Sequence, residues 1–325
     1  MTDAAIPSGH YVVLGASGMF GTHALQTLGN RIGVTVTAIH NKHPISVKAP
    51  NIRCVQADLL DLTQCMKAVP QADTMLLFAG VLATSPVLAR DPVTPVMHNL
   101  RITTNVLEAA HKAGIKRVVW MSSTTGYPSI EEELTEERMF EGDPPPNWYA
   151  LGWATRYLET LCRSYAERFE PRMVITALRP TLPYGEFDHF EESTAHFLPA
   201  LIRRVVNREN PIEVWGDGSQ TRDLVYVGDV MNAVWKSLAR TSGYDAFNIA
   251  HGKSYSINET LMKICALDDF KDANIVHLKN KPTSISNRRF STAKAQKTLG
   301  FEAGTSLDDG LKLTIAWYRA NRPKS

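Results

Sequence analysis

Glycines at three-residue intervals, in the pattern G-x-x-G-x-x-G, are the first feature of the chain that could carry chemistry. They follow an apolar run at residues 11–14 and open a helical pattern over residues 18–28. Glycines at such a junction let the backbone approach a pyrophosphate closely, and the helix N-terminus adds free N–H groups and the positive end of its dipole. Because strand, loop and helix come in the required order, the segment predicts dinucleotide binding. The predicted residues are Gly15, Ser17, Gly18, Met19, Phe20 and Gly21.

The elements that would position this loop alternate along the first half of the chain. Apolar runs predict strands at residues 11–14, 34–39, 52–56, 74–78, 117–121 and 173–178, and helical patterns lie at 18–28, 62–69, 99–113 and 149–169. Uniformly apolar strands separated by helices indicate an α/β fold with a doubly wound parallel sheet. After Arg179 the sequence becomes richer in charge and turns, which indicates a second, smaller unit. Ligands of such folds bind at the carboxyl ends of the strands, so we expect a site between the two units.

Composition excludes several classes of protein. The 325 residues carry 35 basic and 33 acidic side chains, a net charge of +2, with 44% hydrophobic and 21% charged residues. These values are ordinary for a globular protein and exclude collagen-like, disordered and disulfide-dense chains. The balanced charge also argues against a nucleic-acid partner.

Metal, redox and membrane signals are weak in this sequence. The four cysteines include no C-x-x-C pair, and His40 and His43 have no third ligand candidate nearby, so we expect no metal site. No apolar run approaches the roughly 20 residues that span a bilayer, and no secretory signal is recognisable. The expectation is a cytoplasmic protein with no membrane partner.

Later segments carry a more specific pattern. In order along the chain they read Asp58-Leu59, Phe78-Ala79-Gly80, Asn99 within a helix, VVWMSSTTGYP, Arg179-Pro180, WGDGSQTRDLVYVGDV and FNIAHGKSYSI. Together they resemble the extended branch of the short-chain dehydrogenase/reductase superfamily, and specifically its NAD(P)-dependent nucleotide-sugar epimerases and dehydratases. The segment GDGSQTRD is the most specific part of the resemblance.

The resemblance implies a domain organisation and further cofactor contacts. A Rossmann domain would take residues 8–180 and 222–252, and a smaller, discontinuous C-terminal α/β substrate domain would take residues 181–221 and 253–325. Members of this family often form homodimers through two long helices, which correspond to residues 99–113 and 149–169, so we expect a homodimer. The implied cofactor contacts are Asp58, Leu59, Phe78, Ala79, Gly80, Asn99, Tyr149, Trp153 and Pro180.

The resemblance also implies the catalytic residues. In the family a Tyr-x-x-x-Lys pair exchanges a proton with the substrate and binds the nicotinamide ribose, and a Ser or Thr positions the reacting oxygen. Tyr149, Ser123 and Thr124 are the matching candidates, but position 153 is Trp and not Lys. Indole carries no charge and one donor. We therefore expect Tyr149 to act as a proton donor, as ketone reduction requires, rather than as a base.

Trp153 leaves several alternatives open. Its ring would pack against the nicotinamide ribose, or it is a residue of the helix core. A carboxylate from the acidic stretch 131–143 would supply the base, or that stretch is a solvated surface loop. A third possibility is that the chain still binds the cofactor but has lost hydride-transfer activity.

The end of the second predicted strand bears on the choice of cofactor. An acidic residue at this position would bind the adenosine ribose diol and select NAD. The chain has no carboxylate there, and the expected contacts are His40, Asn41 and Lys42. Because Lys42 can pair with a 2′-phosphate, we favour NADP over NAD. The alternative is that Lys42 is a solvated loop cation.

Arginines are the expected substrate contacts, because a guanidinium forms bidentate bonds with phosphate. The resemblance assigns Arg222 and Arg289, the latter adjoining Arg288, to the diphosphate of a substrate. It also places Thr181 and Leu182 at the substrate, although the family has Asn where this chain has Leu182, which removes one polar contact.

The implied activity is NAD(P)-dependent conversion of a nucleotide-activated sugar, by epimerisation, dehydration or keto reduction. Three alternatives remain. One is an NADP-dependent reductase of a non-sugar carbonyl compound. Another is a cofactor-binding protein that has lost hydride-transfer activity. The third is an RNA-associated member of the superfamily, against which the absence of any basic run argues.

Overall fold

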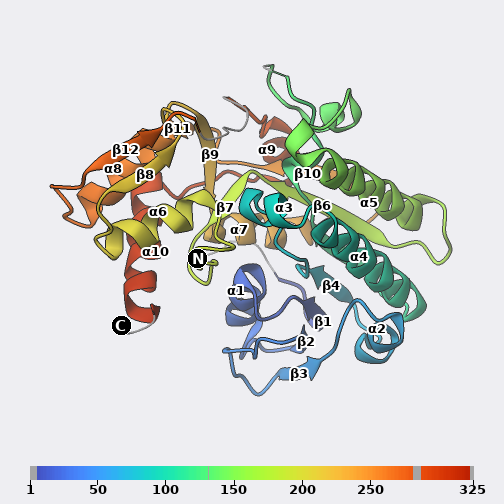
Figure 1. The fold of residues 1–325 in the computed structure, drawn as a ribbon. Coiled ribbons are helices and arrows are strands. Elements are labelled where there is room, and N and C mark those ends of the chain that lie inside the picture. The colour runs from blue at the N-terminus through green and yellow to red at the C-terminus, as the bar shows by residue number, and fades with distance from the viewer. Residues whose placement is uncertain (1–5, 131, 281–286, 323–325) are drawn as a thin grey trace.

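A parallel sheet forms the centre of the larger unit (Figure 1). The computed structural model describes residues 6–130, 132–280 and 287–322. Within these ranges seven strands pair in the order β10-β6-β5-β4-β1-β2-β3, each parallel to its neighbours. This arrangement confirms the predicted α/β fold with its doubly wound sheet. The strands are β1 (Gly9–Leu14), β2 (Val34–His40), β3 (Ile52–Gln56), β4 (Thr74–Leu77), β5 (Arg117–Met121), β6 (Val174–Pro180) and β10 (Tyr244–Ile249).

Helices cover both faces of this sheet, which is why most of its strands are apolar on both sides. One face is covered by α2 (Leu62–Ala68), α4 (Thr94–Lys112) and α5 (Tyr149–Glu167), whose buried residues form one core cluster with alternate residues of β1. The other face is covered by α1 (Met19–Leu28) and α7 (Val227–Ser237), which form a second cluster with the intervening residues of β1. The alternation follows from the two-residue repeat of a strand.

Most predicted bounds agree with the structure to within a few residues, and β3 and β5 agree at both ends. The start of α4 is an exception, because the helix begins at Thr94 and not at Asn99. Pro95 occupies its first turn, where proline is tolerated because its missing N–H would have no helical partner. A short helix that the sequence analysis did not predict, α3 (Ser85–Arg90), precedes it.

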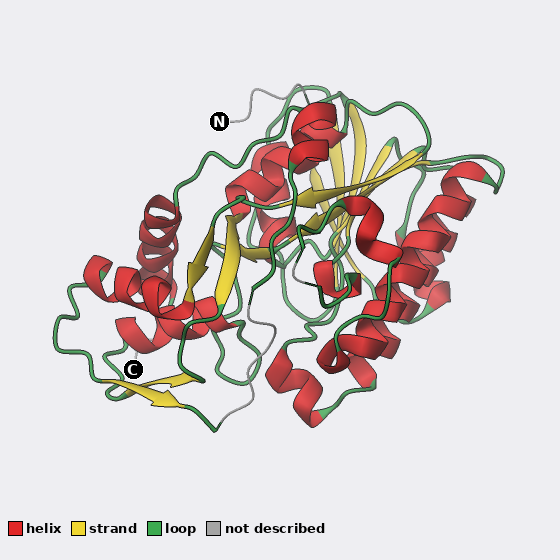
Figure 2. Cartoon of the chain, turned by 90° about the horizontal axis from the view of Figure 1, so that it is seen from above, coloured by secondary structure: helices red, strands yellow, loops and turns green. Residues whose placement is uncertain are grey.

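The second unit has its own core beside the Rossmann sheet (Figure 2). Strands β11 (Ser254–Ser256), β9 (Thr221–Tyr226) and β7 (Leu182–Tyr184) form a three-stranded sheet, and β12 (Ile275–Leu278) pairs with β8 (Ile212–Trp215). These strands pack with α6 (Phe197–Val206), α8 (Ile257–Leu267) and α10 (Leu307–Asn321). The chain returns to the Rossmann core for α7 and β10, and again for α9 (Ala293–Leu299), whose Ala295 lies in the second core cluster. The predicted domain bounds stay a prediction.

A buried ion pair joins α5 to the sheet. Arg179 at the end of β6 donates from Nε and Nη2 to the two carboxylate oxygens of Glu159 on α5, at 2.8 and 2.5 Å. Ser122 and Tyr244 donate to the same carboxylate at 2.7 and 2.9 Å. Burial opposes the charged form of Arg179, but the Glu159 carboxylate outweighs it and raises the pKa of the guanidinium. The network fixes the face that α5 presents to the carboxyl ends of β5 and β6.

Candidate functional site

The glycine loop forms a cradle between β1 and the start of α1. Gly15 has φ of +75°, and a Cβ there would lie 2.7 Å from the backbone N of Ala79. A Cβ on Gly21 would collide with the backbone of Gly15 and Ala16, so α1 can approach the loop only because position 21 is glycine. The backbone at the N-terminus of α1 is therefore open to a phosphate group. These residues fit the pyrophosphate of a dinucleotide.

Further predicted cofactor residues surround this cradle. The ring of Phe20 lies 5.8 Å from that of Phe78, between centroids. Asn99 holds the loop after β4, because its amide accepts from Val81 N–H at 2.7 Å and donates to Val81 O at 2.9 Å. Its contact with Gly80 is also close, since a Cβ there would lie 3.1 Å from Asn99 Oδ1. Asn99 thus shapes the floor of the site through this loop.

The residues predicted to contact the adenosine follow β2 and β3. His40 ends β2, and Asn41 and Lys42 lie exposed beyond it. The Asp58 carboxylate accepts from Leu60 N–H at 3.0 Å and so closes the loop in which Leu59 is buried. Asn105 on α4 donates to the carbonyls of Leu59 and Leu60, at 3.0 and 3.1 Å. The sequence analysis did not select Asn105, which lies six residues after Asn99 in the same helix.

The segment after β5 brings Ser123 next to α5. Ser123 Oγ accepts from the backbone N–H of Thr125 at 3.2 Å and from Thr125 Oγ1 at 3.0 Å. Thr125 Oγ1 in turn lies 3.3 Å from Oγ1 of the buried Thr155. Thr124 is buried, and its carbonyl faces Arg288. The α5 side chain that meets the Ser123–Thr125 pair is therefore Thr155.

Tyr149 and Trp153 lie on a more exposed side of α5. Their side chains are 50% and 43% exposed, and their ring centroids are 6.5 Å apart. Tyr149 opens onto a pocket of about 580 Å³ between the loops at 128–130 and 142–146. Asp143 lines the same pocket, so the phenol and one carboxylate of the acidic stretch share a cavity.

Arg156 does not take the role of the missing Lys. Its guanidinium donates to the carbonyls of Gly126, Glu141 and Gly142 at 2.8, 2.8 and 2.7 Å, and lies 4.7 Å from the centroid of the Trp153 ring. Burial lowers the pKa of this guanidinium. These hydrogen bonds hold loops that border the pocket, so Arg156 shapes the pocket.

The acidic stretch divides into structural and exposed carboxylates. Glu136 is buried, and its carboxylate accepts from the backbone N–H of Asn248 at 2.8 Å. Burial raises the pKa of Glu136. Glu132 and Glu141 lie near Arg138, at 3.7 and 3.9 Å. Glu131, at the start of the predicted stretch, lies outside the described residues.

Arg288 lies beside the segment after β5, within electrostatic range of Arg222 from a distant part of the chain. Arg288 donates to the carbonyl of Tyr127 at 3.0 Å, and Arg222 lies close enough that its charge acts on Arg288. Burial, together with that like charge, lowers the pKa of Arg288 to about 10, and burial lowers the pKa of Arg222. Two neighbouring, desolvated guanidiniums favour an anionic ligand.

Of the two adjacent arginines, Arg288 contacts the segment after β5. Arg289 is exposed, and its backbone carbonyl accepts from Leu134 N–H at 2.9 Å. The sequence pattern could have indicated this difference. In an extended segment, residues two apart lie on the same face, so Arg288 shares a face with the buried Phe290 and Arg289 does not.

The other predicted substrate residues have structural partners. Thr181 is buried and donates to the Asp223 carboxylate at 3.1 Å. Asp223 also accepts from the N–H groups of His251 and Gly252, both at 2.8 Å, which joins β9 to the loop after β10. Leu182 packs against the core of the second unit, and Pro180 is buried at the end of β6.

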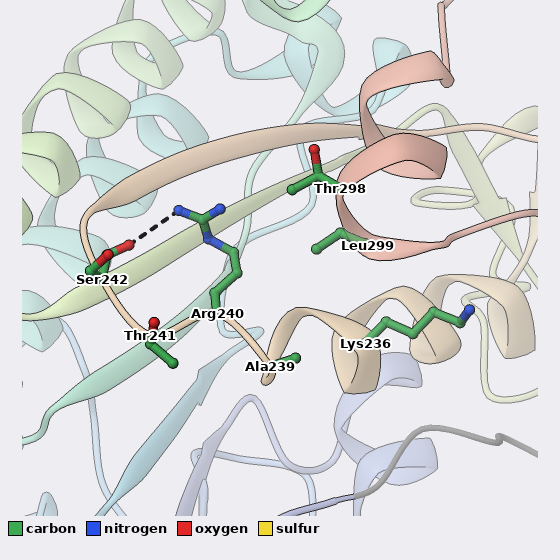
Figure 3. A pocket seen from close by; sticks show the side chains of 7 residues that line it. All are labelled: Lys236, Ala239, Arg240, Thr241, Ser242, Thr298 and Leu299. Atoms are coloured by element: carbon green, nitrogen blue, oxygen red, sulfur yellow. Dashed lines mark hydrogen bonds between the residues drawn. The ribbon is translucent and has the colours of Figure 1, made fainter.

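A second pocket, of about 320 Å³, lies beyond the C-terminal end of α7 (Figure 3). Lys236 and Arg240 line it, but Arg240 donates to Asp245 at 2.9 Å and to the carbonyl of Ser242, and Lys236 donates to Gly300 O. Their charges serve local structure, so we assign no chemistry to this pocket. Among the described residues no group of three His, Cys, Asp or Glu side chains could hold a metal ion, and no helix is long and apolar enough to cross a membrane.

The fold and the glycine cradle define a dinucleotide-binding protein of the Rossmann class. The family model described as "NAD dependent epimerase/dehydratase family" matches residues 11–250. The chain belongs to this family, within the extended short-chain dehydrogenases/reductases, as the resemblance had indicated.

Individual relatives agree with this assignment. GDP-L-fucose synthase 1 of Arabidopsis thaliana is 30% identical over 230 residues, 69% of either chain. A dTDP-4-dehydro-6-deoxy-D-allose reductase of a Streptomyces species is 27% identical over 326 residues, 96% of either chain. The solved structure of MoeE5 in complex with UDP-glucuronic acid and NAD is 27% identical, with a TM-score of 0.83 over 96% of this chain and 99% of that one.

Proposed function

We propose that this chain is an NAD(P)-dependent enzyme that interconverts a hydroxyl and a keto group on a nucleotide-activated sugar. The observation that carries the proposal is the position of the desolvated Arg288 guanidinium, which faces the carbonyl of Thr124 next to Ser123 and lies within electrostatic range of the desolvated Arg222 guanidinium. A diphosphate bound by the arginines would place its sugar next to these hydroxyl groups. The named relatives support a nucleotide-sugar substrate, because they act on GDP- and dTDP-linked sugars.

The proposed chemistry assigns one role to each polar group. A bound nicotinamide supplies or accepts the hydride. Ser123, with Thr124 beside it, donates a hydrogen bond to the reacting oxygen. Tyr149 is the proposed proton donor during ketone reduction, and Asp143, which lines the same pocket, is the proposed proton acceptor in the opposite direction.

Binding of a nucleoside diphosphate tests the substrate class. We expect Arg288→Met to weaken binding of UDP, GDP or dTDP about 10- to 100-fold, because a charge-assisted phosphate bond contributes about 1.5–3 kcal/mol. Isothermal titration calorimetry would measure the dissociation constants of the wild type and of the variant.

Arg289→Met is the matched control, since Arg289 is the adjacent, exposed arginine. The affinity of this variant for the nucleoside diphosphate should stay within about twofold of wild type. Equal effects of the two substitutions would contradict the placement of the phosphates. Absence of nucleotide binding in the wild type, with NADP bound normally, would favour a reductase of non-sugar carbonyl compounds.

NADP is the proposed cofactor, in preference to NAD, because the exposed Lys42 follows β2 where an acidic residue would select NAD. Lys42→Ala should raise the Kd of NADPH about fivefold and leave that of NADH unchanged, as expected for one exposed ion pair. Nucleotide fluorescence would measure both constants. Lys48→Ala, which removes an exposed cation from the same loop, should change neither. Tighter binding of NADH than of NADPH by the wild type would refute the preference.

A homodimer through α4 and α5 is the proposed assembly. Trp153 and Tyr157 on α5 are 43% and 57% exposed, and Met97 on α4 is 40% exposed, so large apolar side chains gather on two adjacent helices. Light scattering should give a dimer for the wild type and a monomer for Tyr157→Glu. Ile32→Glu, at a 96% exposed position in another loop, should leave the mass unchanged. A monomeric wild type would contradict the proposal.

All four cysteines are free thiols, which supports the cytoplasm as the proposed location.

A further inference from the structure

Three hydroxyl groups form a continuous chain from the reaction centre into α5. The chain runs from Ser123 Oγ to Thr125 Oγ1 at 3.0 Å, from there to Thr155 Oγ1 at 3.3 Å, and on to the carbonyl of Leu151 at 2.9 Å. Thr155 is 6% exposed, which shields the α5 end of the chain from competing water. Each hydroxyl has one proton to donate, so the direction of one bond constrains the direction of the next.

Two proton arrangements can use this chain. In the first, Thr125 donates to Ser123, as the structure has it, and Thr155 donates to Thr125 in place of the Leu151 carbonyl, which leaves the Ser123 proton for an acceptor in the site. In the second, the bond between Ser123 and Thr125 is reversed, so that Ser123 donates to Thr125, Thr125 to Thr155, and Thr155 to the Leu151 carbonyl, which leaves an oxygen lone pair of Ser123 for a donor in the site. The backbone N–H of Thr125 donates to Ser123 Oγ in both arrangements.

We propose that Thr125 and Thr155 are positioning residues that let Ser123 switch between hydrogen-bond donor and acceptor as the substrate oxygen changes between keto and hydroxyl forms. A keto oxygen only accepts, whereas a substrate hydroxyl can donate. Reversal of the chain turns three hydroxyl groups and transfers no proton. The inference rests on the proposed interconversion of a hydroxyl and a keto group.

The packing of α5 explains why Thr155 takes this place and Trp153 does not. A Cβ on Gly152 would lie 2.7 Å from the carbonyl of Thr125, so the helix approaches this segment most closely at a glycine. Thr155 and Glu159 follow Gly152 on the same face of the helix, three and seven residues later. Glu159 holds that face inward through Arg179. Position 153 is turned towards solvent.

Removal of the Thr155 hydroxyl tests the inference. Thr155→Val keeps the shape of the side chain, and we expect it to lower kcat about 10-fold in both reaction directions, with KM and the Kd of the cofactor unchanged. The solvent deuterium isotope effect on kcat should also change, because the chain contributes exchangeable protons. Thr155→Ser should restore kcat, since it restores the hydroxyl.

Thr160→Val is the matched control. Thr160 lies on the same helix and donates to the carbonyl four residues before it, as Thr155 does, but it is exposed. It should behave as wild type. If Thr155→Val does not fold, Thr125→Val breaks the same chain at a partly exposed position and should give the same loss.

Three outcomes would overturn the inference: wild-type kcat in Thr155→Val or in a folded Thr125→Val, an equal loss in Thr155→Ser, or no hydride transfer by the wild type with any alcohol or ketone. The proposed substrate class fails separately, if nucleoside diphosphates do not bind while hydride transfer to another carbonyl compound still responds to Thr155→Val.

Discussion

Replacement of Arg179 by methionine is expected to lower the free energy of unfolding by about 3–5 kcal/mol, because it leaves the Glu159 carboxylate buried without its cation. Glu159 is fully buried, and its two carboxylate oxygens accept from Nε and Nη2 of the guanidinium. Ser122 and Tyr244 would remain as donors, but neither is charged. Urea denaturation followed by circular dichroism would measure the change.

The control removes the same kind of side chain at the surface. Arg172 pairs with Glu170 at 2.8 Å, and both side chains are well exposed. Arg172→Met should therefore cost less than about 1 kcal/mol. The double variant Arg179→Met with Glu159→Leu should regain part of the loss, because no unpaired charge is left. If the substitutions at positions 172 and 179 lowered the free energy of unfolding equally, the buried ion pair would stabilise the fold no more than the exposed one.

Gly21→Ala is expected to weaken cofactor binding about 100-fold. The new Cβ would collide with Gly15 O and with the Cα of Ala16, and both atoms belong to backbone that cannot rotate away. The start of α1 must then move from the loop, so the N–H groups no longer converge on the pyrophosphate. Overpacking of this kind costs about 1–3 kcal/mol in a protein core.

Titration of NADH and NADPH into the folded variant would measure the loss. Gly304→Ala is the control, since a Cβ there would meet no atom within 4 Å, and the affinity should not change. A wild-type Kd for Gly21→Ala would mean that the glycine cradle does not bind the cofactor.

Much of the Rossmann unit could be predicted from local sequence. Strands that are buried on both faces must be apolar throughout, so runs such as residues 117–121 stand out from their surroundings. The glycine loop was equally clear, because the collisions at Gly15 and Gly21 occur within one strand–loop–helix unit and its immediate neighbour. Local features of this kind depend on few distant residues.

The reaction centre could be predicted only in part. The sequence drew attention to Trp153, four residues after Tyr149. It did not reveal that Arg156 binds three loop carbonyls, or that Thr155 meets Thr125. The sequence likewise did not reveal which of Arg288 and Arg289 contacts the loop after β5. That depends on how the extended chain around residue 288 passes this loop.

Residue types and their spacing along the chain were sufficient to indicate the family, the alternation of strands and helices in the Rossmann unit and the glycine cradle. Which side of α5 faces Ser123 could be learned only from the packing of the folded chain. The rotation of a helix about its axis is set by what it packs against, here the close approach at Gly152 and the ion pair of Glu159 with Arg179. The sequence shows that position 153 carries no cation. The contact between the hydroxyl groups of Thr155 and Thr125 is seen only in the folded chain.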